Sequence, residues 1–235
     1  MLLPVCECGN VPLARGLMLR GFTTAEALTF LVAAPIVNPL VIVTTYQAFG
    51  FGGGILVVRI VGGYLLANLI GWIVSAHRRP MSLVVPSFAA QCEVGPTSAP
   101  RGGRAGASLS QFADEAASMM PALFVGAGVA AAIQVLVPRS VLVSIGSNPL
   151  LSVLAMVLLA ATISLCSNVD AFFALSFSSS FMPGALTAFL LLGPIVDVKM
   201  LTLLRTTFRS PVLVLLTTVT LAAALTVGWV MNTLV

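Results

Sequence analysis

Long uninterrupted stretches of apolar residues dominate the chain and predict membrane-spanning helices. Each is close to the roughly 20 residues that a helix needs to cross about 30 Å of hydrocarbon. They are residues 53–76, 119–137, 149–166 and 210–235, and Arg59 is the single charged side chain among them. Their apolar residues follow one another directly and do not alternate with polar ones, which argues against the strands of an outer-membrane barrel.

Two further apolar regions are interrupted by prolines and predict broken or re-entrant helices. Residues 4–50 contain Pro35 and Pro39, and residues 164–208 contain Pro194 next to charged residues. A proline inside a helix removes a hydrogen bond and clashes with the preceding turn. Repeated prolines beside polar residues at membrane depth therefore favour helices that stop inside the membrane.

The longest polar stretch, residues 77–118, separates the chain into two halves. It is rich in Pro, Gly, Ser and Ala and holds four arginines, which predicts a flexible loop. Basic residues beside spans favour the cytoplasm, and residues 110–117 at its end predict a short interfacial helix. The expected organisation is a first bundle over residues 1–76, this cytoplasmic loop and interfacial segment, and a second bundle over residues 119–235.

The composition fits a membrane protein and no soluble class. Hydrophobic residues make up 59% of the 235 residues and charged residues only 8%, against roughly 25% charged residues in a soluble domain. This excludes a soluble enzyme, a disordered chain and a nucleic-acid binder. The net charge of +4 is then explained by the positive-inside rule. We expect an all-α polytopic protein of the inner (plasma) membrane, with the lipid bilayer as its surroundings.

The two proline-broken regions predict an internal repeat. Residues 30–38 and 189–197 share a Phe, a Pro-Ile-Val and a final Asn or Asp at a constant offset of 159 residues. Two predicted spans precede Cys166, whereas almost nothing precedes Cys8 at the corresponding place. We expect that the first copy has lost its leading spans, that the chain begins at an internal start site, or that a partner supplies the rest. The pattern leaves open whether the copies are parallel or inverted.

Charged and amide side chains inside apolar surroundings are the first candidates for function. A charge at the bilayer centre costs about 2.5–3.5 kcal/mol on insertion scales. One explanation is a buried ion pair of Asp170 or Asp197 with Lys199 that locks the two copies together. The other, which we favour, is a polar cavity for substrate or protons, because Asn38 and Asp197 recur at the same repeat position. The candidate substrate-binding residues are Glu7, Asn38, Asp170, Asp197 and Lys199.

Three cysteines are candidates for soft-ion ligands. Cys6 and Cys8 are separated by one residue, and two thiols at this spacing can bind Cu(I), Zn(II) or trivalent arsenic together. Cys166 of the second copy would add a third sulfur. The alternative is that these are ordinary small buried residues. We expect Cys92, in the polar stretch, to take no part.

No cofactor is expected. With a single histidine, His77, the chain cannot form a His-based metal site or a catalytic triad. It also lacks the GxxxxGK[ST] phosphate loop, so ATP hydrolysis by that route is excluded. If transport is active, coupling to an ion or proton through Asp170 or Asp197 is the simplest hypothesis.

Four short motifs resemble the ArsP-like (YraQ-like) family of bacterial permeases. They are residues 4–13 (PVCECGNVPL), 34–39 (APIVNP), 166–172 (CSNVDAF) and 192–199 (LGPIVDVK). The resemblance implies a multi-spanning inner-membrane permease and no enzyme. Because some members are implicated in efflux of trivalent organoarsenicals, it also implies export of a soft metal, a metalloid or a thiol-reactive small molecule.

Two other functions stay open at this point. The chain could be a non-transporting membrane subunit that acts with a second membrane protein or as a homo-oligomer. It could also be a membrane thiol oxidoreductase that uses Cys6 and Cys8, although a disulfide between cysteines this close is strained. The chain carries no sequence sign of a quinone or flavin site.

Overall fold

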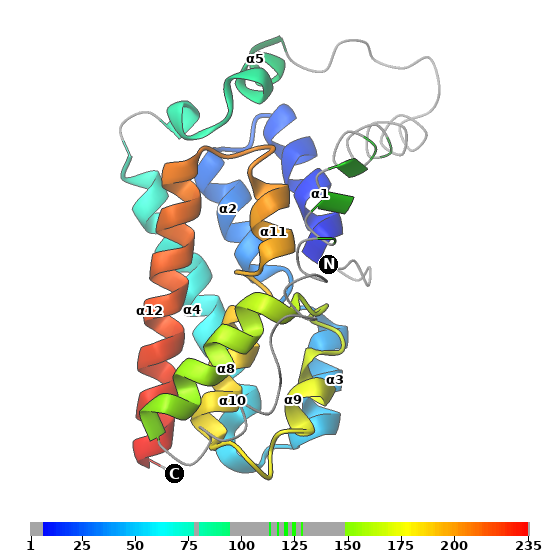
Figure 1. The fold of residues 1–235 in the computed structure, drawn as a ribbon. Coiled ribbons are helices and arrows are strands. Elements are labelled where there is room, and N and C mark those ends of the chain that lie inside the picture. Colours follow the sequence, from blue (N-terminus) through cyan, green and yellow to red (C-terminus); the bar gives the residue numbers. More distant parts are fainter. Residues whose placement is uncertain are drawn as a thin grey trace.

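The computed structural model describes residues 7–77, 80–94 and 149–234, together with the helical positions 113, 117, 120, 121, 124, 125 and 128. Over these residues the chain is helical, apart from turns and one isolated antiparallel bridge between Val84 and Phe208. The predicted all-α membrane fold is therefore confirmed (Figure 1).

The helices follow one another in the chain with these bounds: α1 Glu7–Leu19, α2 Thr24–Ala33, α3 Pro39–Phe49, η1 Gly52–Gly54, α4 Ile55–Ser75, η2 Pro80–Leu83, α5 Pro86–Val94, α8 Pro149–Ile163, α9 Asp170–Leu175, α10 Pro183–Leu192, α11 Val198–Leu204 and α12 Ser210–Leu234. The predicted spans 53–76 and 210–235 correspond to α4 and α12, and 149–166 contains the shorter α8. Most of the predicted span 119–137 lies outside the described residues.

Two of the described helices, α4 and α12, are long and apolar enough to cross a membrane, and they run antiparallel. At one end, a Cβ built on Gly54 at the start of α4 would lie 3.8 Å from the Met231 methyl near the end of α12. At the other end, the Val84–Phe208 bridge joins the segment after α4 to the segment before α12. The directions of the shorter helices follow from their contacts with this antiparallel pair.

The two proline-containing regions each form two short helices with a break between them. In the first region α2 ends at Ala33 and α3 begins at Pro39, and in the second α10 ends at Leu192 and α11 begins at Val198. Both ends of α10 lie 159 residues after the ends of α2. The prediction of broken helices is thus confirmed, with each break centred on the Pro-Ile-Val motif.

The two broken helices start at opposite ends of the molecule. Gly71, near the end of α4, packs against Thr29 of α2 so closely that a Cβ would overlap the threonine hydroxyl. Gly184, at the start of α10, donates its N–H to Asn232 Oδ1 at 2.8 Å, near the end of α12. Because α4 and α12 end on opposite sides, α2 and α10 start on opposite sides. Figure 1 shows α2 and α11 in the upper half and α3 and α10 in the lower half.

Helices of the two halves interleave and do not form separate bundles. α9 packs against α3, α1 packs against α11, and α10 packs against α4 as well as α8 and α12. All residues of α10 after Pro183, its first residue, are buried. The core therefore runs through both halves, with α10 in its middle.

Part of the stretch that we expected to be a flexible loop is folded. Residues 80–94 contain η2, the Val84 bridge and α5, and Phe88 of α5 is 1% exposed. The Arg15 guanidinium lies 4.1 Å from the centre of the Phe88 ring, a cation–π contact. The apolar side chains of this segment pack onto the bundle. The sequence did not predict this packing, because the Pro and Ser residues of the segment are typical of a loop. Of the predicted interfacial helix 110–117, only positions 113 and 117 are described, and both are helical.

Candidate functional site

A buried ion pair joins the two halves of the chain. Arg59 of α4 is fully buried, and Asp170, the first residue of α9, is 2% exposed. Arg59 Nη1 donates to Asp170 Oδ1 at 3.0 Å, and Nη2 donates to Oδ2 at 2.6 Å. This paired geometry is the strong form of an arginine–carboxylate contact. It holds together residues 111 positions apart in the sequence.

Thr45 of α3 also binds the guanidinium of this ion pair. Arg59 Nη1 also donates to Thr45 Oγ1 at 2.8 Å, and Thr45 Oγ1 donates to the Val41 carbonyl at 2.7 Å. Arg59 Nε is buried and has no hydrogen-bond partner among the described residues. A buried donor without a partner is costly, so this nitrogen is a place where a water or a polar ligand would be stabilised.

Of the two explanations for the buried charges, the ion pair named Lys199 as the cation for Asp170 or Asp197. Asp170 pairs with Arg59 instead. Arg59 was not among the site residues expected from the sequence, although the signal was present. It is the single charge in an otherwise apolar span, and a charge inside a transmembrane helix is a candidate for function.

The connection between α8 and α9, residues 164–169, leaves the helical conformation and carries polar side chains. Ser164 has a positive φ of 47°, which is uncommon for a residue with a side chain. Ser164 Oγ and Asn168 Oδ1 are buried without a hydrogen-bond partner among the described residues. Cys166 lies half-buried between them in the chain. Non-helical backbone at membrane depth is tolerated where it is buried in protein or lines a cavity, and unpartnered polar atoms fit such a lining.

Asn38 and Asp197, the polar residues at matched repeat positions, are N-caps of the helices that follow the breaks. Asn38 Oδ1 accepts from the Leu40 N–H at 3.0 Å at the start of α3. Asp197 Oδ1 accepts from the Met200 N–H at the start of α11. Their recurrence thus has a local structural reason, because a helix that restarts inside the protein needs its first N–H groups satisfied.

Both breaks lie against the same level of α4. A Cβ on Gly63 would be 2.5 Å from Ile36 Cδ1 in the first break, and a Cβ on Gly62 would be 3.8 Å from Leu191 Cδ1 at the end of α10. Gly62 and Gly63 are near the middle of α4, only a turn beyond Arg59. The breaks and the ion pair therefore occupy the middle of the molecule together.

The remaining predicted site residues are only partly tested. Lys199 is half-buried in the first turn of α11, two residues after Asp197. Cys6 and the side chains of Glu7 and Cys8 lie outside the described residues. Among the residues that are described, no group of three His, Cys, Asp or Glu side chains could hold a metal. The three-thiol site stays a prediction.

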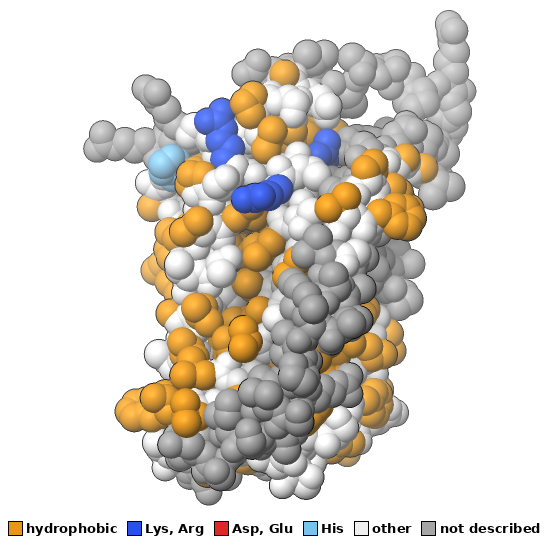
Figure 2. All heavy atoms as spheres, viewed as in Figure 1, with side chains coloured by type: hydrophobic (Ala, Val, Ile, Leu, Met, Phe, Trp, Pro, Cys, Tyr) orange, Lys and Arg blue, Asp and Glu red, His pale blue; other side chains and the backbone are white. Residues whose placement is uncertain are grey.

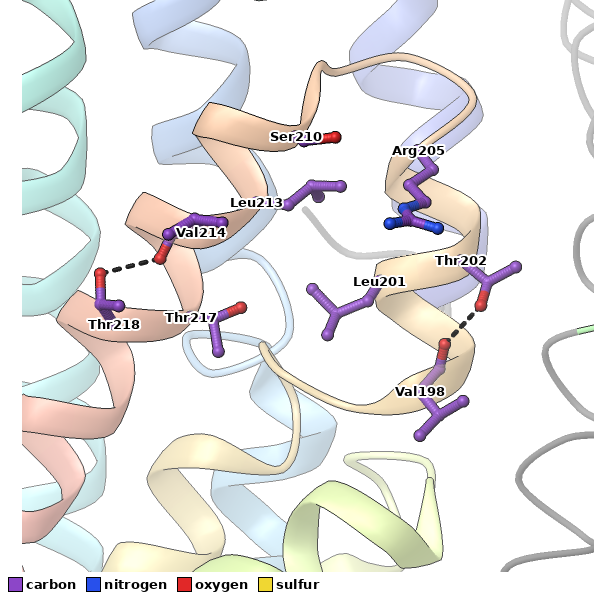
Figure 3. Close-up of a pocket in the computed structure, with 9 residues that line it drawn as sticks. All are labelled: Val198, Leu201, Thr202, Arg205, Ser210, Leu213, Val214, Thr217 and Thr218. Atoms are coloured by element: carbon purple, nitrogen blue, oxygen red, sulfur yellow. Dashed lines mark hydrogen bonds between the residues drawn. The ribbon is translucent and has the colours of Figure 1, made fainter.

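A separate groove of about 420 Å³ lies between α11 and α12 (Figure 3). It is lined by Val198, Leu201, Thr202, Arg205, Ser210, Leu213, Val214, Thr217 and Thr218. Figure 3 shows Arg205 on the α11 side of the groove. Lysine and arginine side chains gather in the upper part of the face in Figure 2, so the groove belongs to the arginine-rich end.

Comparison with known proteins identifies the family. The chain is 40% identical over 223 residues to UPF0718 protein YcgR of Bacillus subtilis (strain 168), covering 93% of this chain and 74% of that protein. It is 35% identical over 212 residues, covering 88% of this chain and 68% of the relative, to a Streptococcus mutans protein named as a subunit of a two-component membrane permease complex. No solved structure gives a significant match. The model of the ArsP_1 family, described as predicted permeases, matches residues 1–233, so the chain belongs to this permease family.

Proposed function

We propose that this chain is an inner-membrane permease that moves a small molecule through the junction of its two broken helices. One observation carries the proposal: α2 and α10 start at opposite ends and stop at the same level of α4, beside Gly62 and Gly63. Broken helices that meet near the midplane, in copies of opposite direction, are typical of the binding sites of secondary transporters.

We propose further that the polar path runs along the residues gathered at this level. Arg59 Nε, Ser164 Oγ and Asn168 Oδ1 would gain hydrogen bonds from a polar substrate or from water, because each is buried without a partner among the described residues. Asn38, Asp170, Asp197 and Lys199 would line the same path, and Glu7 would join it from α1. The arginine-rich end, with residues 77–118, would face the cytoplasm.

The Arg59–Asp170 pair would link α4 to α9, which would move relative to each other during transport. Breaking a buried pair by removing one partner is far more costly than replacing both, so the pair favours one arrangement of α4 and α9. A proton or a substrate that weakens it would release α9 from α3 and α4. This gives Asp170 a role in ion coupling, with Asp197 as the alternative proton site.

For the substrate we propose export of a soft metal, a metalloid or a thiol-reactive small molecule. Cys166 supports this because it lies in the same unwound connection as Ser164 and Asn168, and thiolates select soft ions. Cys6 and Cys8 would supply two further sulfurs.

The test is a panel of metal and arsenical sensitivities in a strain that lacks the protein and is complemented with variants. We expect Cys6→Ser combined with Cys8→Ser, and Cys166→Ser alone, to abolish resistance while the protein still inserts. Cys92→Ser is the matched control and should keep full resistance. Unchanged substrate accumulation in cells with the double variant would reject the thiol role.

The second candidate function is that of a subunit in a permease complex. The Streptococcus mutans relative is named as such a subunit. Co-purification of a second membrane protein in fixed ratio would support it. Transport by the chain alone in proteoliposomes would contradict it.

A further inference from the structure

The groove between α11 and α12 has the size and lining of a binding site for an amphipathic molecule. Its volume of about 420 Å³ lies within the roughly 300–1,000 Å³ of small-molecule pockets. Leu201, Leu213 and Val214 contribute apolar surface. The groove is separate from the junction of the two breaks, because it lies between α11, which follows the second break, and the long helix α12.

Two of the four hydroxyl groups that line the groove, those of Thr202 and Thr218, are compatible with an apolar chain. Thr202 Oγ1 donates to the Val198 carbonyl at 2.7 Å, and Thr218 Oγ1 donates to the Val214 carbonyl at 2.8 Å (Figure 3). Because these protons are already used within each helix, the hydroxyls need no further partner from a ligand. An apolar chain can therefore pass them at little cost.

Arg205 provides a positive charge at this groove. Its side chain is exposed, and none of the described acidic residues forms an ion pair with it. Figure 3 shows its guanidinium in front of α11, on that side of the groove. A guanidinium beside an apolar groove is complementary to a ligand with a phosphate or carboxylate head and an apolar tail.

The corresponding cleft in the first half already contains an anion. At the offset of 159 residues, Thr218 of the groove corresponds to Arg59 of α4. In the first half, Arg59 of α4 donates to the Asp170 carboxylate that α9 supplies, and Thr45 of α3 accepts a further hydrogen bond from the same guanidinium. An arginine, Arg205, is again present in the groove between α11 and α12. It lies at the end of α11 and not on the long helix, and no described acidic side chain is paired with it.

We infer that the α11–α12 groove binds an anionic phospholipid, with the phosphate on Arg205 and an acyl chain along Leu213 and Val214. A lipid is favoured over a soluble anion because the groove lies between two helices of a membrane protein, at its arginine-rich end. Basic pockets between transmembrane helices on the cytoplasmic side are typical sites for anionic headgroups.

The test is lipid binding to the purified full chain in detergent, measured by native mass spectrometry. Phosphatidylglycerol is compared with phosphatidylcholine, which has the same chains and no net charge. We expect bound phosphatidylglycerol on the wild type and a loss of about tenfold in affinity with Arg205→Gln, because this variant removes the charge that binds the phosphate; a tenfold loss corresponds to about 1.4 kcal/mol. Arg20→Gln is the matched control, because Arg20 is an exposed arginine at the same end.

A second variant tests the groove itself. Thr218→Phe fills the acyl part while it keeps Arg205, and we expect the same loss of phosphatidylglycerol. Equal binding by the wild type and Arg205→Gln, or equal binding of the two lipids, would overturn the inference. Decyl phosphate, a soluble amphiphile, distinguishes the sources. Arg205-dependent binding of decyl phosphate without any phosphatidylglycerol would make the groove a solute site and would also overturn the lipid assignment.

Discussion

Arg59 and Asp170 form a doubly hydrogen-bonded ion pair that is enclosed between α4 and α9. The two residues come from the two halves of the chain and are 111 positions apart. Because Thr45 of α3 binds the same guanidinium, three helices share one charged contact. A charge inside a transmembrane helix is energetically costly, and this ion pair links the two halves of the chain.

Removing one partner of the pair should destabilise the protein far more than removing both. We expect Arg59→Met or Asp170→Leu to lower the free energy of unfolding by about 3–5 kcal/mol, because the other charge stays buried without its partner. Arg59→Met combined with Asp170→Leu should recover most of that loss. Thermal unfolding of the four proteins in detergent measures this cycle, and Arg20→Gln serves as the exposed control. Additive losses in the double variant would show that the pair is not coupled.

The transport activity of the same proteins separates structure from function. If the pair serves only the fold, the double variant should transport as well as the wild type. If the pair is the link between moving parts, the double variant should be stable and inactive, which is the result we expect.

Two adjacent glycines in α4 should respond differently to one added methyl group. A Cβ on Gly63 would overlap Ile36 Cδ1 and Cγ2 at 2.5 Å, whereas a Cβ on Gly62 would make an ordinary contact of 3.8 Å with Leu191. We expect Gly63→Ala to cost roughly 1–3 kcal/mol by overpacking and Gly62→Ala to be tolerated. Adding Ile36→Val to Gly63→Ala should recover part of the loss. Equal effects of the two alanines on the unfolding temperature would contradict the close approach of the first break to α4.

Two roles of Asp197, as a helix cap and as a carrier of charge, can be tested separately. The side chain accepts from the Met200 N–H, and Asn caps a helix about as well as Asp. Asp197→Asn should therefore keep the stability, whereas Asp197→Ala should lose about 1 kcal/mol. If Asp197 also carries a proton or a substrate, Asp197→Asn will be stable and inactive in a transport assay. Full activity of this variant would leave capping as its sole role.

A disulfide can test the contact between the segment after α4 and the segment before α12. Val84 and Phe208 face each other in the antiparallel bridge, flanked by hydrogen bonds from Val85 N to Thr207 O and from Arg209 N to Leu83 O, each 2.9 Å long. Directly opposed residues of this kind have Cα atoms about 4.5 Å apart, which is within the range of a disulfide. In a background without the native cysteines, Val84→Cys with Phe208→Cys should cross-link on mild oxidation. Persistently reduced thiols would contradict the bridge.

Local features of the fold were predictable from the sequence, and long-range ones were not. The long apolar stretches predicted α4 and α12, and the prolines predicted the breaks near Pro35 and Pro194, because both depend on neighbouring residues. The partner of Asp170 was not predictable, since the contact with Arg59 requires the packing of distant helices. The opposite directions of α2 and α10 were also open, because an apolar pattern has no direction.

The candidate site was predicted in part for the same reason. Asn38 and Asp197 stood out beside the prolines, and the structure gives them the local role of caps. The unpartnered atoms of Ser164 and Asn168 had no signal in the sequence, because burial without a partner is a property of the packed chain. The folded segment around Phe88 was missed because its composition resembles that of a loop.

The opposite directions of the two broken helices are the central claim, and cysteine labelling tests them most directly. Phe22, just before α2, and Ser179, just before α10, are both exposed. In a background without the native cysteines, Phe22→Cys and Ser179→Cys are labelled with a membrane-impermeant maleimide in vesicles of either orientation. We expect the two positions to react from opposite sides of the membrane. Reaction of both from the same side would contradict it.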